Sequence, residues 1–222
     1  MEAKEIYNLE KLEDCVDRAF RQLHIKQNNR NSVEFLLSAL KLKHEYTYAH
    51  SLNVALIAKD ISDYLGFQQK PLFFAGLLHD VGKLTIRQEL FNNGKYSEED
   101  AKEMEMHVLN GYYIASGVHE FSAQILLRHH HFQDNGYPAL IPGPLANLGK
   151  KATENIVRYA RLLSLADFYV ALTTRDDSRE RITPDMLTNI RILIVDKKPH
   201  DYVLADELLR NGILDNSKYV KI

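Results

Sequence analysis

The stretch LLHDVGKL, residues 77–84, places a histidine and an aspartate side by side at the end of an apolar segment. Adjacent residues of a regular helix point about 100° apart. His79 and Asp80 therefore reach one metal ion only near a helix end, or with Asp80 swung to bridge two ions. Gly82 allows a tight turn that returns Lys83 to the same side. A structural interpretation is also open, in which His79 is simply buried, Asp80 caps the next segment and Lys83 faces solvent.

Apolar residues recur at helical spacing along most of the chain, and sustained alternation with a period of two is absent. We therefore predict an all-α fold. The predicted helical segments are residues 5–24, 31–66 with a break near His44, 71–78, a segment opened by a cap at Ser97 and Asp100, 121–130, a stripe from Ile156 to Thr174, a segment starting at Thr183–Pro184, and 202–209. The polar stretch KQNNRN, residues 26–31, is predicted to be a loop, with Asn31 and Glu34 as a capping box.

Composition excludes several classes of protein. The chain has 222 residues and a formal charge of −2, so it lacks the basic excess typical of proteins that bind duplex nucleic acid. Its longest apolar stretch, residues 71–78, is far shorter than the roughly 20 residues that span a bilayer. The charged N-terminus does not resemble a secretory signal. A single cysteine, Cys15, suits a reducing cytoplasm. We therefore expect a cytoplasmic protein that binds neither duplex nucleic acid nor membrane.

Several polar residues interrupt the apolar faces of the predicted helices. His50 lies on a face with Val54 and Ile57, where a lone histidine is most often an ordinary core residue. Asp167 lies in the middle of an apolar stripe, and burying its carboxylate is costly unless a cation or hydrogen-bond donors meet it. His107 repeats the pattern on another helix. Inward ligand-type residues on several helices together indicate a metal site.

The chain carries an ordered set of motifs that includes these residues. They are HSLNVALIA (50–58), LLHDVGKL (77–84), MHVLNG (106–111), QILLRHH (124–130), NGYP (135–138) and LADFYVALTTR (165–175). In this order they resemble the HD superfamily of metal-dependent phosphohydrolases, and more specifically the HD-GYP subgroup, whose members hydrolyse cyclic di-GMP. The resemblance implies an HD-domain helical bundle over residues 44–222, preceded by an N-terminal helical extension over residues 1–43.

The resemblance also implies the residues of the site. By this resemblance, a first metal would be bound by His50, His79, Asp80 and Asp167. A second metal would be bound by Asp80, His107, His129 and His130. Asp80 and Lys83 would be catalytic. Tyr137 would stack on a guanine, and Arg175 or Arg179 would hold the distal phosphate. The alternative for these last three is an ordinary turn with solvated arginines. Mixed imidazole and carboxylate ligands favour iron or manganese over magnesium or calcium.

Three departures from the subgroup stand out. His131 occupies the position of a glutamate that usually follows the paired histidines, and the loop to Gly136 is one residue shorter. Tyr46 stands where some members carry a glutamate that recruits a third metal. We therefore expect two divalent transition-metal ions.

The implied function is a two-metal phosphodiesterase that cleaves a cyclic dinucleotide, cyclic di-GMP above all, by attack of a metal-bridging hydroxide. One alternative is an HD phosphohydrolase that acts on a mononucleotide or another phosphate ester. A second alternative is a non-catalytic sensor of cyclic dinucleotides. The expected partner is the nucleotide substrate, and a homodimer or a separate regulatory protein is left open.

Overall fold

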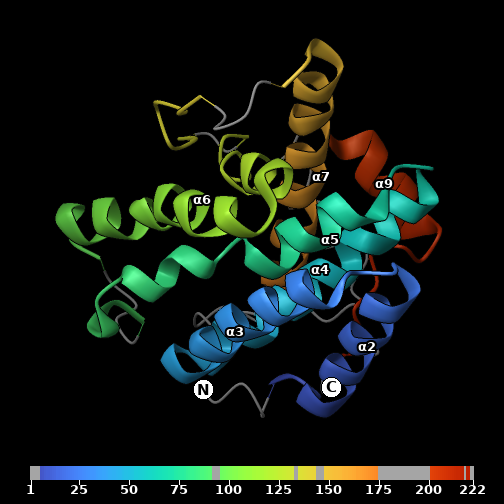
Figure 1. Cartoon of the computed structure of the whole chain (residues 1–222), viewed down its shortest axis with the longest axis horizontal. Helices are drawn as coiled ribbons and strands as arrows, with labels where there is room; N and C mark the ends of the chain where they lie inside the picture. Colours follow the sequence, from blue (N-terminus) through green and yellow to red (C-terminus); the bar gives the residue numbers. More distant parts are fainter. Residues whose placement is uncertain are drawn as a thin grey trace.

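The chain is described by a computed structural model that covers residues 6–91, 96–132, 135–143, 148–174, 201–217 and 219–220 (Figure 1). The α-helices are α2 (Leu9–Gln22), α3 (Gln27–Lys43), α4 (Glu45–Tyr64), α5 (Gln69–Leu78), α6 (Glu98–Leu126), α7 (Lys150–Thr174) and α9 (Tyr202–Arg210). Two 3-10 helices, η1 (Val81–Thr85) and η2 (Gln88–Phe91), follow α5. Across the described ranges, extended pairing is confined to one antiparallel bridge between Tyr7 and Val220. The predicted all-α fold is confirmed.

Local signals in the sequence account for several helix boundaries. The break near His44 is confirmed, because this residue is extended (φ −159°, ψ 99°) and its imidazole accepts a hydrogen bond from the Thr47 N–H at the start of α4. The cap at Ser97 is also confirmed, as a full capping box in which Ser97 and Asp100 each accept from the other's backbone N–H. These caps fix where the two helices that carry His50 and His107 begin.

Other predicted boundaries were wrong or lie elsewhere. The predicted loop at residues 26–31 is mostly helix, because α3 already starts at Gln27. Arg30 stabilises this first part of α3 through ion pairs with Asp17 of α2, at 2.6 Å, and with Glu34, at 2.7 Å. By contrast, the separate helix predicted from residue 121 is confirmed, because His119 is extended (φ −156°, ψ 93°) and divides α6 into two helices at a kink. The predicted helix at Thr183–Pro184 lies outside the described residues.

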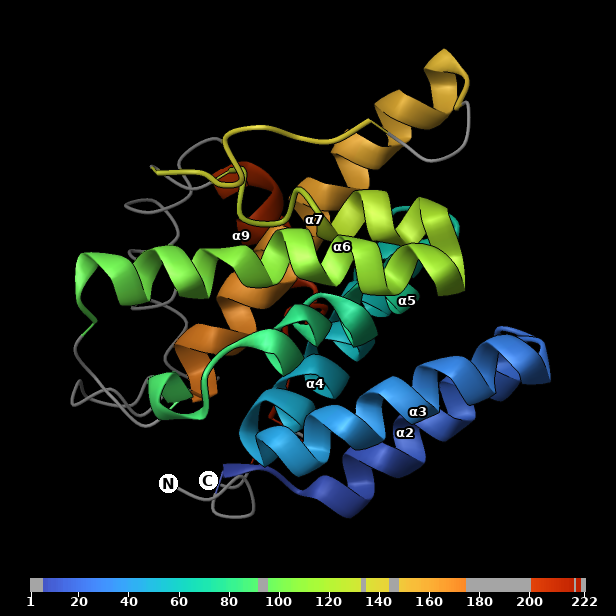
Figure 2. The same ribbon diagram turned by 60° about the vertical axis from the view of Figure 1, so that its left-hand side comes forward.

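Helix α4 forms the centre of the bundle. Fourteen of its twenty residues are buried. Helices α2 and α3 pack on one side of it, while α5 and α7 pack on others (Figures 1 and 2). The predicted extension thus lies directly against the central helix, and the division at residue 43 stays a prediction. Within the described ranges, no helix combines the length and the apolar character needed to cross a membrane.

Gly82 allows η1 to pack tightly against α6. A Cβ atom at this position would lie 1.8 Å from the carbonyl oxygen of His107 and 2.5 Å from the backbone nitrogen of Gly111. Such contacts are far inside van der Waals distance, so any side chain here forces the two elements apart. Gly82 therefore determines how closely the segment carrying His79 and Asp80 approaches the helix carrying His107.

We predict that Gly82→Ala lowers the free energy of unfolding by roughly 1–3 kcal/mol, because the added methyl group overpacks this contact. Chemical denaturation of the purified protein measures the effect. Gly117→Ala is the matched control, since a Cβ at this exposed position of α6 meets no atom within 4 Å. The control is expected to be neutral or stabilising. Equal stability of the two variants would contradict the proposed packing constraint.

Candidate metal centre

The structure brings together all seven residues predicted as metal ligands. They come from α4 (His50), the end of α5 (His79 and Asp80), α6 (His107), the turn after α6 (His129 and His130) and α7 (Asp167). Three overlapping groups have ligand atoms within 4.8 Å of one another, namely His50, His79 and Asp80; His79, His129 and Asp167; and His107, His129 and His130. Because His79 and His129 are each shared by two groups, the three groups form one cluster.

The end of α5 explains how two adjacent residues enter one site. Helix α5 ends at Leu78, His79 keeps helical dihedral angles, and Asp80 turns away (φ −100°, ψ 5°) into the 3-10 helix η1. The change of direction removes the separation of about 100° that a continuous helix would impose. The prediction that both side chains meet only near a helix end agrees with this geometry.

Three of the histidines are oriented by the same kind of contact. The Nδ1 atoms of His79, His107 and His129 lie 2.8, 2.5 and 2.5 Å from the backbone carbonyl oxygens of the residues three positions earlier. A carbonyl oxygen only accepts, so each Nδ1 carries the proton and each neutral ring presents the lone pair of its Nε2. These three Nε2 atoms are buried and have no hydrogen-bond partner. Buried polar atoms without partners are rare, and three that face one cluster are what a metal-binding site requires.

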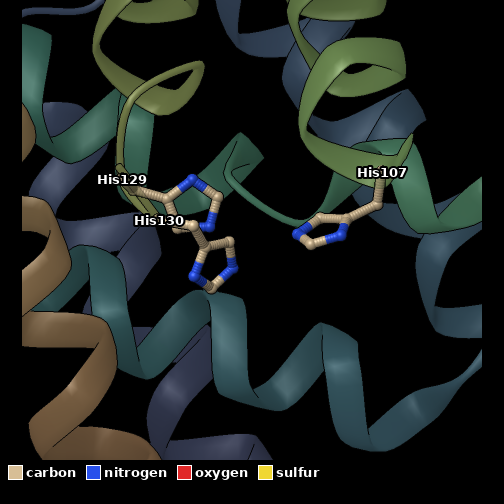
Figure 3. Close-up of side chains that lie close together, drawn as sticks. All are labelled: His107, His129 and His130. Carbon is tan, nitrogen blue, oxygen red and sulfur yellow. The ribbon is translucent and has the colours of Figure 1, made fainter. Parts of the chain in front are cut away.

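The side chains of His129 and His130, in the turn after α6, face the side chain of His107 across the metal centre (Figure 3). His129 and His130 lie side by side, with ring centroids 3.9 Å apart. The ring of His107 is 5.8 Å from that of His129 and 5.3 Å from that of His130. The three imidazoles thus form one side of the cluster, as expected for the second metal.

Asp80 lies between the two halves of the cluster. Its Oδ1 is 3.4 Å from Nε2 of His107, whereas its Oδ2 is 3.5 Å from Nε2 of His79 and 2.7 Å from Nζ of Lys83. The two oxygens of one carboxylate therefore face histidines of different predicted metal sites. This arrangement suits a bridging ligand.

His50 and Asp167 complete the other half. Nε2 of His50 lies 2.9 Å from Oδ1 of Asp167, and the buried Nδ1 of His50 has no hydrogen-bond partner. The same Asp167 oxygen is 3.7 Å from Nε2 of His79. A cation held by these three residues would replace the contact between His50 and Asp167.

Burial sets the charge state of the histidines. Desolvation lowers the pKa of His107 to about 4 and that of His129 to about 3, and it also lowers the pKa values of His50 and His130. At neutral pH these imidazoles are therefore uncharged, which is the form that binds metals.

Unlike the imidazoles, the two carboxyl groups are charged at neutral pH. Burial acts to raise the pKa of Asp80, but attraction by nearby positive charge, from Lys83 first, outweighs it and holds that pKa well below the usual value. For Asp167, burial is likewise outweighed, first by the hydrogen bond from His50. The cluster at neutral pH therefore combines ionised carboxylates with imidazole lone pairs. Lone pairs and carboxylate oxygens 3.4–3.7 Å apart repel unless a cation lies between them.

A small cavity of about 30 Å³ opens onto this centre. Its walls are formed by Tyr46, Thr47, His50, Asp80, Lys83, His130 and Asp167. Sequence reasoning missed Thr47 as part of the site. Its spacing of three residues before His50 on the same helix was the available signal.

The predicted substrate contacts are only partly described. Tyr137 lies beside the metal cluster, with its ring stacked on His130 at a centroid distance of 4.7 Å. Arg175 and Arg179 lie outside the described residues. His131 is exposed and does not belong to the three ligand groups. The substrate roles of Tyr137 and the two arginines stay predictions.

We predict that the metal-free protein loses stability on acidification from about pH 6.5 to pH 4. In this window the unfolded chain protonates His107, whose ordinary pKa is 6.5, whereas the folded chain does not until about pH 4. The difference for this one residue corresponds to on the order of 3 kcal/mol by pH 4. Denaturation curves in the presence of a chelator at pH 7, 5.5 and 4.5 measure the loss.

Two variants sharpen this pH test. His107→Gln removes one buried imidazole and is expected to flatten the pH dependence. His131→Gln, at an exposed position, serves as the control and should follow the parent protein. Stability that stays constant between pH 7 and pH 5 in the metal-free protein would contradict neutral buried imidazoles.

Two curated proteins are similar to this chain. The 3'3'-cGAMP-specific phosphodiesterase 1 of Vibrio cholerae is 25% identical over 186 residues, which are 80% of this chain and 40% of that protein. A cyclic di-GMP phosphodiesterase of Pseudomonas aeruginosa is 31% identical over 150 residues, which are 63% of this chain and 34% of that protein. The chain therefore spans less than half the length of these relatives.

Solved structures and a family model agree on the fold. The HD domain of the L. monocytogenes phosphodiesterase PgpH in complex with cyclic-di-AMP has a TM-score of 0.56 and 18% identity, covering 81% of this chain and 94% of that one. The same domain in a second structure gives 0.55 and 16%, covering 81% and 95%. The sequence model of the HD domain family matches residues 47–172, more than half of the 222 residues. The chain belongs to the HD domain family.

Proposed function

We propose that this chain is a two-metal phosphodiesterase of the HD-GYP type that hydrolyses a cyclic dinucleotide, and cyclic di-GMP in particular. The observation that carries the proposal is the set of buried Nε2 atoms without partners on His79, His107 and His129. Those of His79 and His107 lie 3.4–3.7 Å from the carboxylates of Asp80 and Asp167, and His129 belongs to the same ligand group as Asp167. Facing lone pairs destabilise a buried core, so their presence supports a site that binds cations.

The donor set favours iron or manganese. Imidazoles mixed with carboxylates suit first-row transition metals, whereas magnesium and calcium prefer oxygen ligands. Two such ions, when bound, supply a nucleophile at neutral pH and stabilise the charge of an in-line displacement at phosphorus. His50, His79 and Asp167 would hold one ion and the three histidines of Figure 3 the other, with Asp80 between them.

Lys83 is proposed to neutralise the phosphate during bond cleavage. Its ammonium group is 2.7 Å from Oδ2 of Asp80, and it forms part of the cavity wall. The Lys83 side chain is 19% exposed, so it contacts both the buried carboxylate and the cavity. A cation that is already oriented there offsets the negative charge that develops on the phosphate oxygens without further reorganisation.

The names of the relatives support the proposed substrate class. The two curated relatives are, by name, phosphodiesterases for 3'3'-cGAMP and for cyclic di-GMP, and the more identical of the two acts on cyclic di-GMP. Arg175 and Arg179 are proposed to hold the distal phosphate of such a substrate, as bidentate donors to phosphate oxygens. With one cysteine in the chain, we place the reaction in the reducing cytoplasm.

We predict that the protein purified with iron or manganese holds close to two ions per chain and that Asp80→Asn holds fewer than one. Loss of a bridging ligand is expected to weaken metal affinity by more than about 100-fold, because even the partners of ligands contribute 10–100-fold. Elemental analysis and turnover measure both effects. Asp60→Asn, at a position in α4 outside the cluster, is the control. Two ions and full turnover in Asp80→Asn would refute the bridging role.

We further predict that cyclic di-GMP is cleaved faster than 3'3'-cGAMP, cyclic di-AMP or a panel of nucleoside monophosphates. Each compound is incubated with the iron- and the manganese-loaded protein, and the products are separated by chromatography. Release of phosphate from a monophosphate, with cyclic dinucleotides left intact, would assign the chain to mononucleotide hydrolysis. Binding of cyclic di-GMP without cleavage under either metal would make it a sensor.

A further inference from the structure

The turn formed by residues 135–138 folds back onto the turn that carries the paired histidines. A Cβ atom on Gly136 would lie 2.4 Å from the carbonyl oxygen of His131, so only glycine fits against this backbone. The next residue, Tyr137, stacks its ring on His130 with 4.7 Å between centroids and 28° between planes. It also meets His107 edge-on at 6.2 Å and 77°. Two successive residues of the turn thus touch the histidine side of the cluster.

The ring of His130 packs against three other rings. Its centroid lies 3.9 Å from that of His129, 5.3 Å from that of His107 and 4.7 Å from that of Tyr137. Of these three neighbours, Tyr137 alone is not itself a predicted ligand.

The far end of the same loop is also attached to α6. The hydroxyl of Tyr112 donates to the carbonyl oxygen of Gly143 at 3.2 Å, and Nε2 of Gln124 donates to that hydroxyl at 3.1 Å. Tyr112 is fully buried, five residues after His107 on the same helix. Loop 135–143 is therefore fixed at both ends to the unit that supplies His107, His129 and His130.

We propose that Tyr137 is a positioning residue for the second metal ion: its ring holds the His130 imidazole in the orientation that ligation needs, and Gly136 permits the close approach. The inference deepens the proposed function and rests on it for the existence of that ion. One face of the Tyr137 ring is engaged by His130. The role expected from the sequence, stacking on a guanine, is therefore restricted to the opposite face.

Metal binding in the absence of substrate tests the proposal. Cobalt(II) is titrated into the chelator-treated protein, and its visible absorption and the bound stoichiometry are recorded for Tyr137→Leu and Tyr137→Phe. Tyr137→Leu is expected to weaken the second ion at least about tenfold, to alter its absorption and to leave the first ion unchanged. Tyr137→Phe keeps the ring and should restore parental binding. Tyr113→Leu is the matched control, because Tyr113 is 58% exposed on α6 and lies outside the cluster.

A second variant tests whether the loss in Tyr137→Leu comes from the position of the ring or only from the introduced leucine. Gly136→Ala retains the tyrosine but forces the turn away from His131, and it is expected to weaken the second ion in the same way. Thermal melting of the metal-free variants checks that each one is folded.

Several results would overturn the inference. Parental affinity for both ions in Tyr137→Leu would remove the positioning role, and a raised KM with unchanged metal binding would assign the ring to the substrate instead. Equal losses in Tyr137→Phe and Tyr137→Leu would assign the effect to the hydroxyl. A parent protein that binds only one ion would refute the inference. A parent that binds two ions but cleaves no cyclic dinucleotide would refute only the proposed substrate, because the metal titration still reports on Tyr137.

Discussion

The close approach of buried carboxylate oxygens to imidazole lone pairs is the constraint on which this structure depends. Asp80 and Asp167 lie within 3.4–3.7 Å of Nε2 atoms that carry no proton when the rings are neutral. Such facing acceptors are unfavourable in a buried site unless a cation lies between them. Several local features keep these residues, which are distant in sequence, in one arrangement. They are the caps at the starts of α4 and α6, the turn at Asp80 after α5, and the tight packing at Gly82.

Carbonyl groups at the ends of α5 and α6 orient two of the predicted ligands. The last four carbonyls of a helix lack a complete set of donors within that helix. His79 follows α5 directly and uses the carbonyl of Gly76, whereas His129 follows α6 and uses that of Leu126. Each contact satisfies a terminal carbonyl and fixes a tautomer at once. The rings are thereby presented with Nε2 toward the centre before any ion is bound, which is the preorganisation that metal sites need.

The sequence predicted most of the helices, because helical periodicity is a local pattern. The ligand set implied by the family resemblance stays a prediction, and the structure places its seven residues together. Asp167 was identifiable from its place in an apolar stripe, and the cap at Ser97 from its spacing to Asp100. The start of α3 was not identifiable, since Arg30 stabilises that turn by pairing with Asp17 on another helix. The carbonyl contacts of the imidazoles and the stacking of Tyr137 were likewise beyond prediction, because they follow from how separate elements pack.

Hydrogen bonds connect the N-terminal helices α2 and α3 to α4, the helix that carries His50 of the metal centre. The hydroxyl of Tyr48 donates to Glu13 of α2 at 2.9 Å, and Lys41 of α3 donates to the same carboxylate at 2.7 Å. Burial and then the hydrogen bond to Glu13 raise the pKa of Tyr48 above its ordinary value, so this hydroxyl remains a donor at any physiological pH. Tyr48 lies two residues before His50 on one rigid helix. Helices α2 and α3 are therefore connected by hydrogen bonds to the turn of α4 that carries the predicted ligand His50.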